Sequence, residues 1–371
     1  MFINTKFVNK LILYWWIKKF INTILFLCLI GFICNASAQK KREIRLGLPV
    51  VVINSSYCMF AVAIRQGYFS AEGLDVKINN IAGSTSVVQT LLGGRLDIGA
   101  ATPEPVFKAY SQGEKVIFIY NFVRKPTGSV AVFINSPIKT IADLKGKKLG
   151  AQGLGSGNIM LTNALLHNVG IDGKKEVKYL SVGVGSQALL ALESGHVDAL
   201  ILFDTLYAQI EALGAKLRYI QGDEQEDLFS TQFIINSDNI EKDYLVYVGF
   251  GRAMAKASIF AKVNPEACVR MLWQEYPSIR ISGIPESEQL KSDIAILNKR
   301  MELMLPSEEL GKGWGHYDSK SISAWNNFAF EGGIIDKKIE RINGIYDNRF
   351  VAGFNNFDKN SILEKSKQIQ K

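Results

Sequence analysis

The chain has 371 residues and a formal net charge of +8 at pH 7, and 47% of its residues are hydrophobic while 21% are charged. This length allows two lobes that each bury a sizeable core. Basic and acidic side chains are interspersed, so the chain has no electrostatic footprint for nucleic acid. Its three scattered histidines, without paired cysteines, argue against a metal-centred enzyme or a structural zinc, and we expect no cofactor.

The first 38 residues have the pattern of a secretory signal peptide. Four lysines precede an apolar run, Ile24–Ile33, and residues 36–38 (Ala-Ser-Ala) form a small-residue cleavage site before Gln39. An uncleaved membrane anchor is the alternative, because Leu11–Ile17 is apolar too, although the clean run is shorter than the roughly 20 residues that span a membrane. We expect a soluble periplasmic protein that begins at Gln39, and loss of the four lysines lowers its formal charge from +8 to +4.

Two cysteines, Cys58 and Cys268, remain in the predicted mature protein. An exported protein can oxidise such a pair to a disulfide. Nothing in the sequence places the two side chains together, so two separate thiols are the favoured interpretation and pairing stays open.

Strand and helix patterns alternate from residue 44 onward, which predicts a doubly wound α/β arrangement. The expected elements are strands at 44–48, 76–79, 97–100 and 116–120, with helices at 57–66, 87–92 and 105–112.

One segment occurs twice, and its landmarks Gly94 and Asp97 recur as Gly195 and Asp198, an offset of 101 residues. Each copy is a small-residue loop, a short helix, a glycine that ends the helix and a buried strand. Such a loop leaves backbone N–H groups free at the helix start. The repeat predicts two similar lobes that grip a small ligand. We expect both aspartates to act as structural turn residues rather than as an acid/base pair.

The division between lobes is predicted from two similar strands, Val130–Ser136 and Thr231–Ser237, which both end in Ile-Asn-Ser. We interpret them as hinge strands that cross between the lobes. Lobe 1 would then begin with residues 39–133, lobe 2 would be residues 138–228, and residues 231–371 would return to lobe 1 and add C-terminal helices. Those helices are expected at 247–262, 265–273, 286–305 and 319–331.

Two stretches resemble a known family. Ser136–Gly150 resembles the crossover signature of periplasmic solute-binding proteins, and Gln66–Val76 resembles the G-Y-F-x-x-E-G-L-D-V run of the NitT/TauT-type (nitrate/taurine/thiamine-precursor) binding proteins of ABC importers. Asp97–Pro105 and Gly195–Ala199 match the same family, and the resemblance covers about residues 43–235. It implies a two-lobed clamshell that captures a small-molecule solute and delivers it to a membrane permease. We expect a monomer that is not an enzyme.

Candidate ligand-binding residues follow from the rule that ligands of open α/β sheets bind beyond the carboxyl ends of strands, at helix N-termini. In lobe 1 the rule selects Asn54, Ser55, Tyr57, Gly83, Ser84, Thr85, Thr102 and Glu104. In lobe 2 it selects Ser156, Gly157, Asn158, Gly185, Ser186, Phe203 and Asp204. Structural roles remain open for many of them: the serines before helices suit N-caps, Tyr57 and Phe203 suit a core, and Asp204 suits a helix cap.

The selected loops contain aromatic and acidic residues but no Arg or Lys. This composition favours a neutral or cationic aromatic solute, such as a pyrimidine precursor of thiamine, over a sulfonate or nitrate, which would need a cation or several N–H donors. The alternatives are an enzyme of the same fold, of the thiamine-pyrimidine synthase or menaquinone-pathway dehydratase type, and an extracellular sensor module. No catalytic Ser-His-Asp or Cys-His set can be assembled from the sequence.

Overall fold

The computed structural model describes residues 16, 19, 40–304 and 311–369. The predicted cleavage site and the apolar run before it lie outside the described residues. The chain separates into two units, Met1–Lys41 and Arg42–Lys371, and the description below concerns the second unit. Among the helices that the structure describes, none combines the length and the apolar character needed to cross a membrane.

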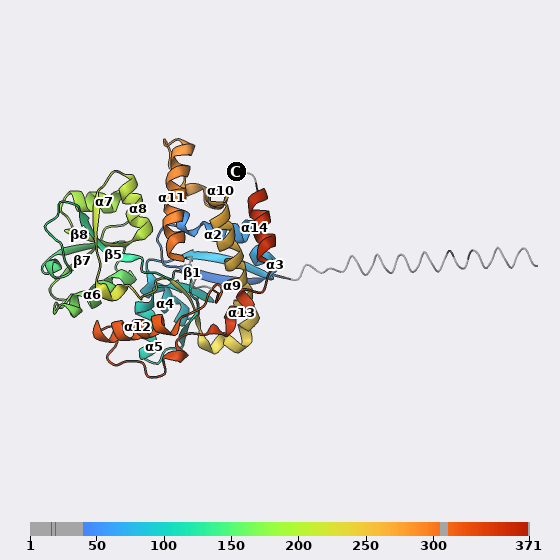
Figure 1. Cartoon of the computed structure of the whole chain (residues 1–371), viewed down its shortest axis with the longest axis horizontal. Coiled ribbons are helices and arrows are strands. Elements are labelled where there is room, and N and C mark those ends of the chain that lie inside the picture. Colours follow the sequence, from blue (N-terminus) through green and yellow to red (C-terminus); the bar gives the residue numbers. More distant parts are fainter. Residues whose placement is uncertain (1–15, 17–18, 20–39, 305–310, 370–371) are drawn as a thin grey trace, which may run out of the picture. The chain divides into compact units, whose positions relative to one another are not determined.

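The first sheet, in which Figure 1 labels β1, contains five strands in the order β2-β1-β3-β10-β4. Strand β1 is parallel to β2 and β3, whereas β10 is antiparallel to both β3 and β4. The strands are β1 (Arg42–Leu48), β2 (Leu74–Asn80), β3 (Ile98–Ala101), β4 (Val116–Tyr120) and β10 (Gln232–Asn236). The helices between them are α2 (Cys58–Arg65), α3 (Tyr68–Ala71), α4 (Ser84–Leu92) and α5 (Pro103–Ser111), and a 3-10 turn, η1 (Ser55–Tyr57), precedes α2.

The second sheet repeats this plan with the order β7-β6-β8-β5-β9. Strand β6 is parallel to β7 and β8, and β5 is antiparallel to β8 and β9. Its strands are β5 (Gly128–Phe133), β6 (Lys148–Ala151), β7 (Lys178–Ser181), β8 (Ala199–Phe203) and β9 (Leu217–Ile220), and its helices are α6 (Gly157–Asn168), α7 (Ser186–Glu193) and α8 (Asp204–Ala212). The predicted pair of doubly wound lobes is therefore confirmed.

The duplicated segment has the same local structure in both lobes. Gly94 and Gly195 follow their helices with φ of 70° and 67°, a conformation that suits glycine. Asp97 and Asp198 each accept a hydrogen bond from a backbone N–H of the neighbouring strand, that of Arg45 at 2.8 Å and that of Lys148 at 2.7 Å. Both aspartates therefore fasten the start of a strand, as the sequence predicts.

The predicted crossings are wrong. Residues 128–133 form β5, which pairs with β8 and β9 inside the second sheet, and residues 232–236 form β10 inside the first sheet. The chain passes between the sheets after β4, which ends at Tyr120, and returns after β9, which ends at Ile220. The two strands look alike because they occupy equivalent positions, each being the antiparallel strand that its sheet receives directly after a crossing.

The two crossing segments are bonded to each other. The backbone of Val123 donates to Thr231 and accepts from Ser230, both at 2.9 Å, and the hydroxyls of Thr127 and Ser230 lie 2.6 Å apart in a buried contact. These bonds hold the two connections between lobes as one paired unit, which is where we expect bending on lobe closure.

The C-terminal helices pack mainly on the first lobe. They are α9 (Ile240–Val263), α10 (Pro265–Glu275), α11 (Glu286–Met304), α12 (Ser319–Glu331), α13 (Val351–Phe354) and α14 (Lys359–Gln368). Two of them also reach the second lobe: α11 contacts both η1 and α8, and α12 contacts both α5 and α6.

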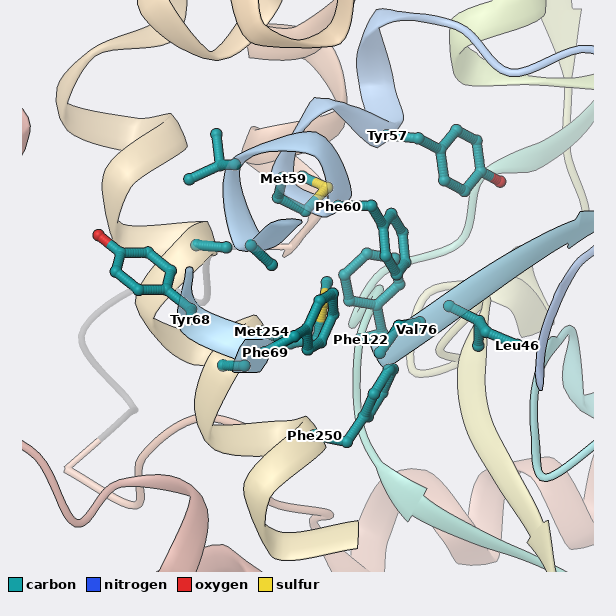
Figure 2. Packing of buried hydrophobic residues seen from close by; sticks show 14 of the residues in the cluster. Leu46, Tyr57, Met59, Phe60, Tyr68, Phe69, Val76, Phe122, Phe250 and Met254 are labelled. Carbon is teal, nitrogen blue, oxygen red and sulfur yellow. The ribbon is translucent and has the colours of Figure 1, made fainter. Parts of the chain in front are cut away.

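The core of the first lobe lies between its sheet and helices α2, α9 and α10. Aromatic and aliphatic side chains fill it, among them Phe60, Phe122 and Phe250 (Figure 2). The favoured interpretation of two separate thiols is wrong, because Cys58 of α2 and Cys268 of α10 form a disulfide with their Cα atoms 5.4 Å apart. The sequence could not reveal this pair because 210 residues separate its members.

Candidate ligand-binding site between the lobes

A small enclosed cavity lies where the polar loops of the two lobes meet. Its walls come from lobe 1, from lobe 2 and from the crossing segments, and they comprise Pro49, Tyr57, Ser84, Thr102, Thr127, Gln152, Ser156, Gly157, Asn158, Phe203, Thr231 and Arg300. Seven of the residues selected from the sequence are in this set. Its volume of about 20 Å³ is close to the room that one water molecule needs, so the lobes are closed on each other in this structure.

A second small cavity adjoins the first and shares Thr102, Thr127 and Asn158 with it. It adds Glu104, the side chain of Gln225 and the ring of Trp325 from α12. The two cavities together are lined by hydroxyl, amide, carboxyl and aromatic groups from both lobes. This mixture of a few polar groups with apolar surfaces is typical of small-molecule sites.

Glycines permit the close approach of the two lobes. The backbone N–H of Thr85 donates to the carbonyl of Gly155 in the opposite lobe at 3.3 Å. A Cβ atom on Gly83 would overlap the Gly155 carbonyl, and one on Gly157 would overlap the Thr102 hydroxyl. The loop before α4 and the loop before α6 thus meet backbone to backbone, a contact that side chains would prevent.

Several selected side chains hold these loops in shape. The Ser84 hydroxyl accepts a hydrogen bond from the Thr102 backbone at 3.0 Å, and the Asn158 amide donates to the Leu202 carbonyl at 2.7 Å. Ser156 caps α6 by accepting from the Asn158 backbone, and Asn54 caps η1 by accepting from that of Ser56. Of the serine N-caps that the sequence left open, that of Ser156 is present, whereas Gly83 and Gly185 are the N-cap residues of α4 and α7.

Glu104 is a buried carboxyl group at the start of α5, with 2% of its surface exposed. Its Oε2 atom accepts no hydrogen bond from any described residue, and the same holds for the Thr102 hydroxyl beside it. Burial raises the pKa of Glu104 to about 7. A buried acceptor without a partner, in a cavity between lobes, is suited to a ligand that donates a hydrogen bond.

Arg300 of α11 is the main feature that the sequence analysis missed. Its guanidinium donates to both carboxylate oxygens of Asp204, from Nη2 at 2.6 Å and from Nε at 3.0 Å. It also lies over the rings of Tyr57 and Phe203, 5.9 and 5.8 Å from their centroids. Burial alone would lower the pKa of Arg300, but the Asp204 carboxylate outweighs this effect and the pKa is raised.

A signal for Arg300 does exist in the sequence. Arg300 lies three residues after Leu297 and four after Ile296, so it falls on the apolar face of a helix, where an arginine is unusual. The strand-end rule could not select it, because α11 is not attached to a strand of either sheet. The structure thereby also gives Asp204 a role as the partner of a buried cation.

The remaining selected residues lie outside the two cavities. Ser55 is buried in η1, and Thr85 is half-buried at the loop contact. Gly185 is half-buried and Ser186 is exposed at the start of α7, and neither lines either cavity. Their contact with a ligand stays a prediction.

Two similar lobes, two paired crossings and polar loops that face each other across a closed cavity define the periplasmic-binding-protein class of clamshell folds. The model of the NMT1/THI5-like family matches residues 54–268, which is more than half of the chain, and the chain belongs to this family.

The names of its curated relatives indicate different functions. A putative thiamine biosynthesis protein of Haemophilus influenzae is 27% identical over 46% of this chain, and the match spans only 53% of that relative's length. The formylaminopyrimidine-binding protein of Halalkalibacterium halodurans is 25% identical over 67% of this chain and 75% of its own. A Legionella pneumophila protein named 4-amino-5-hydroxymethyl-2-methylpyrimidine phosphate synthase is 24% identical over 61% of this chain and 72% of its own.

Solved structures confirm the fold. The periplasmic aliphatic sulphonate binding protein SsuA of Escherichia coli has a TM-score of 0.59 at 18% identity, covering 83% of this chain and 99% of that one. The periplasmic nitrate-binding protein NrtA of Synechocystis has a TM-score of 0.61 at 11% identity, covering 90% and 99%. The desulfurization enzyme DSZB has a TM-score of 0.51 at 12% identity, covering 85% and 99%, so the fold is shared by binding proteins and by an enzyme.

Proposed function

We propose that this protein is an extracytoplasmic solute-binding protein that captures a small organic solute between its two lobes and delivers it to the permease of an ABC importer. The observation that carries the proposal is the closed interlobe cavity, to which each lobe contributes side chains from the loops after its strands. Closure of two lobes around a solute is the usual way in which such clamshells work.

The chemistry of the cavity supports a neutral or cationic aromatic solute. Tyr57, Phe203 and Trp325 offer aromatic surfaces, and Glu104 offers a buried acceptor oxygen that no described residue bonds. An aminopyrimidine has both a flat ring and N–H donors. The names of the relatives from Halalkalibacterium halodurans and Haemophilus influenzae agree with a thiamine-related pyrimidine as the solute class.

The test begins with protein purified from its native source without added ligand. Mass spectrometry of the denatured protein should release a small heteroaromatic compound, and calorimetry with that compound should give one saturable site per chain. Absence of any co-purified compound, together with no saturable binding of aminopyrimidines, would contradict the proposal.

An enzymatic function is the second candidate, and the name of the Legionella pneumophila relative favours it. Within residues 40–304 and 311–369, no group of three or more His, Cys, Asp or Glu side chains could hold a metal ion. The same titration distinguishes the two candidates, because chromatography of the mixture after calorimetry should recover the solute unchanged from a binding protein and as a product from an enzyme.

A further inference from the structure

The pair formed by Asp204 and Arg300 joins the two lobes, and its Arg300 member lines the first cavity. Asp204 is the first residue of α8 in lobe 2, and Arg300 belongs to α11, which packs on η1 of lobe 1. Their side chains are 6% and 2% exposed. Of the described residues that line the two cavities, Arg300 alone carries a positive charge.

A buried guanidinium at a ligand cavity is ordinarily a site for an anion. Its planar fork matches the oxygens of a carboxylate or a sulfonate and binds them through two parallel hydrogen bonds. In this protein Asp204 makes two such bonds, to the Nε–Nη2 edge of the guanidinium. A carboxylate of the protein thus already neutralises the guanidinium that lines the cavity and takes the Nε–Nη2 edge, at which an anion could bind.

We propose that Asp204 determines the charge selectivity of the site by occupying Arg300, so that anionic solutes are excluded while neutral and cationic solutes are accepted. The inference rests on the proposed function, since it concerns the ligand of the same cavity. An anion that displaced Asp204 would leave that carboxylate buried, unpaired and close to the negative charge of the ligand, which is costly in a protein interior. A neutral or cationic solute leaves the pair intact.

The experiment compares the wild-type protein with Asp204→Asn, which keeps the shape of the side chain and removes its charge. Sodium methanesulfonate and sodium nitrate serve as probes, and binding is measured by calorimetry in a buffer without chloride. We expect wild-type protein to bind neither anion with a dissociation constant below about 1 mM, and Asp204→Asn to bind at least one of them roughly tenfold more tightly or better. Adding Arg300→Gln to the Asn variant should abolish this gain.

Asp97→Asn is the matched control. Asp97 also holds an arginine through two hydrogen bonds, from Arg45 at 2.8 and 3.0 Å, but it lines neither cavity. This variant should bind the two anions as weakly as wild-type protein does. Circular dichroism and thermal unfolding establish that each variant is folded, and Asp204→Ser replaces Asp204→Asn if the latter does not fold, because serine also suits a helix start.

Two results would overturn the inference: tight anion binding by the wild-type protein, or a folded Asp204 variant with no gain in anion affinity. Titration of the wild-type protein with the co-purified compound reports on the proposed function separately. A gain in anion affinity without any organic solute for the wild-type protein would retain the selectivity role of Asp204 and reject the proposed function.

Discussion

Two buried ionisable groups line the cavities, and they differ in whether a group of opposite charge lies beside them. Arg300 is compensated by Asp204, whereas Glu104 has no charged partner among the residues that the structure describes, and its pKa is raised to about 7. Near neutral pH the site can therefore hold or release a proton at Glu104. A ligand that donates a hydrogen bond to the carboxylate, or accepts one from the carboxylic acid, selects between these two states.

This raised pKa makes the stability of the ligand-free protein depend on pH. Between about 4.5, the ordinary pKa, and about 7, the unfolded chain loses the Glu104 proton while the folded chain keeps it, so the free energy of unfolding falls as pH rises through this window. The loss attributable to Glu104 is on the order of 3 kcal/mol. Glu104→Gln should remove it, and chemical denaturation between pH 4.5 and 8 is the measurement.

The control for this prediction is Glu114→Gln, which changes an exposed carboxylate. Its pH profile should run parallel to that of the wild-type protein. A Glu104→Gln profile that is also parallel to the wild type would show that the Glu104 proton is not retained in the folded state.

At the residue scale, the strand-end rule found Glu104, Tyr57 and Phe203 because each follows a predicted strand closely in the chain. It missed Arg300, which reaches the cavity only through the packing of α11 against η1 and α8. A local sequence pattern can identify residues that follow the strands. The position of a residue on a distant helix depends on tertiary packing, which the local pattern does not encode.

At the element scale, the loop before α6 controls how closely the lobes approach. Gly157 faces the Thr102 hydroxyl of the other lobe, and any side chain at this position would hold the two lobes apart. Gly153 lies four residues earlier, in the loop that leads into α6, yet a Cβ atom there would meet only the Cβ of Ala82, at 4.0 Å. A substitution of glycine by alanine should therefore disrupt the contact between the lobes at Gly157 and leave it unchanged at Gly153.

Gly157→Ala should weaken binding of the co-purified solute by roughly tenfold or more, because overpacking of a tight contact costs about 1–3 kcal/mol and this contact forms only when the lobes close. Gly153→Ala should bind like the wild-type protein. Calorimetry gives the affinities, and small-angle scattering should show a larger radius of gyration for liganded Gly157→Ala. Equal affinities for the two variants would mean that closure at this loop is not coupled to binding.

The duplicated aspartates are a second feature at this scale. Asp97 binds the backbone and guanidinium of Arg45, and its pKa is lowered: burial acts to raise it, but the hydrogen bonds from Arg45 outweigh that effect. Asp97→Ala should lower the free energy of unfolding by about 1–3 kcal/mol and leave the affinity of the folded protein unchanged. Urea denaturation and calorimetry test the two halves of this prediction, and a loss of affinity in fully folded protein would place Asp97 in the site.

The repeat was readable from the sequence because both copies keep the same glycine and aspartate at a constant offset. The crossings could not be located in the same way. Strands β5 and β10 have the composition of buried strands, and that composition does not indicate which sheet a strand joins. Sheet membership is decided by pairing with strands far away in the chain, such as β5 with β8 and β9.

At the scale of the whole molecule, the lobes are joined by more than the two crossings. Helix α11 contacts α8, and α12 contacts α6, so both helices link the lobes outside the hinge. The Cys58–Cys268 disulfide ties α2, which directly follows the cavity residue Tyr57, to α10. The position of Tyr57, which lines the cavity, thus depends on the C-terminal helices.

Removal of the disulfide should destabilise the protein. The double variant Cys58→Ala/Cys268→Ala opens a long covalent loop, and we expect the free energy of unfolding to fall by about 3–5 kcal/mol. Urea denaturation of the double variant and of wild-type protein, each with and without a reducing agent, is the measurement. Reduction should lower the stability of the wild-type protein toward that of the variant and leave the variant unchanged. Equal stabilities of the oxidised wild-type protein and the variant would show that the disulfide does not stabilise the fold.

The same disulfide encloses a complete lobe. All five strands of the second sheet lie between residues 128 and 220, inside the segment that Cys58 and Cys268 bracket. A protease that cuts a surface loop of this lobe once therefore breaks the polypeptide without releasing a fragment, because the two pieces remain joined through sulfur. The nicked chain would migrate as one species on a non-reducing gel and as two after reduction.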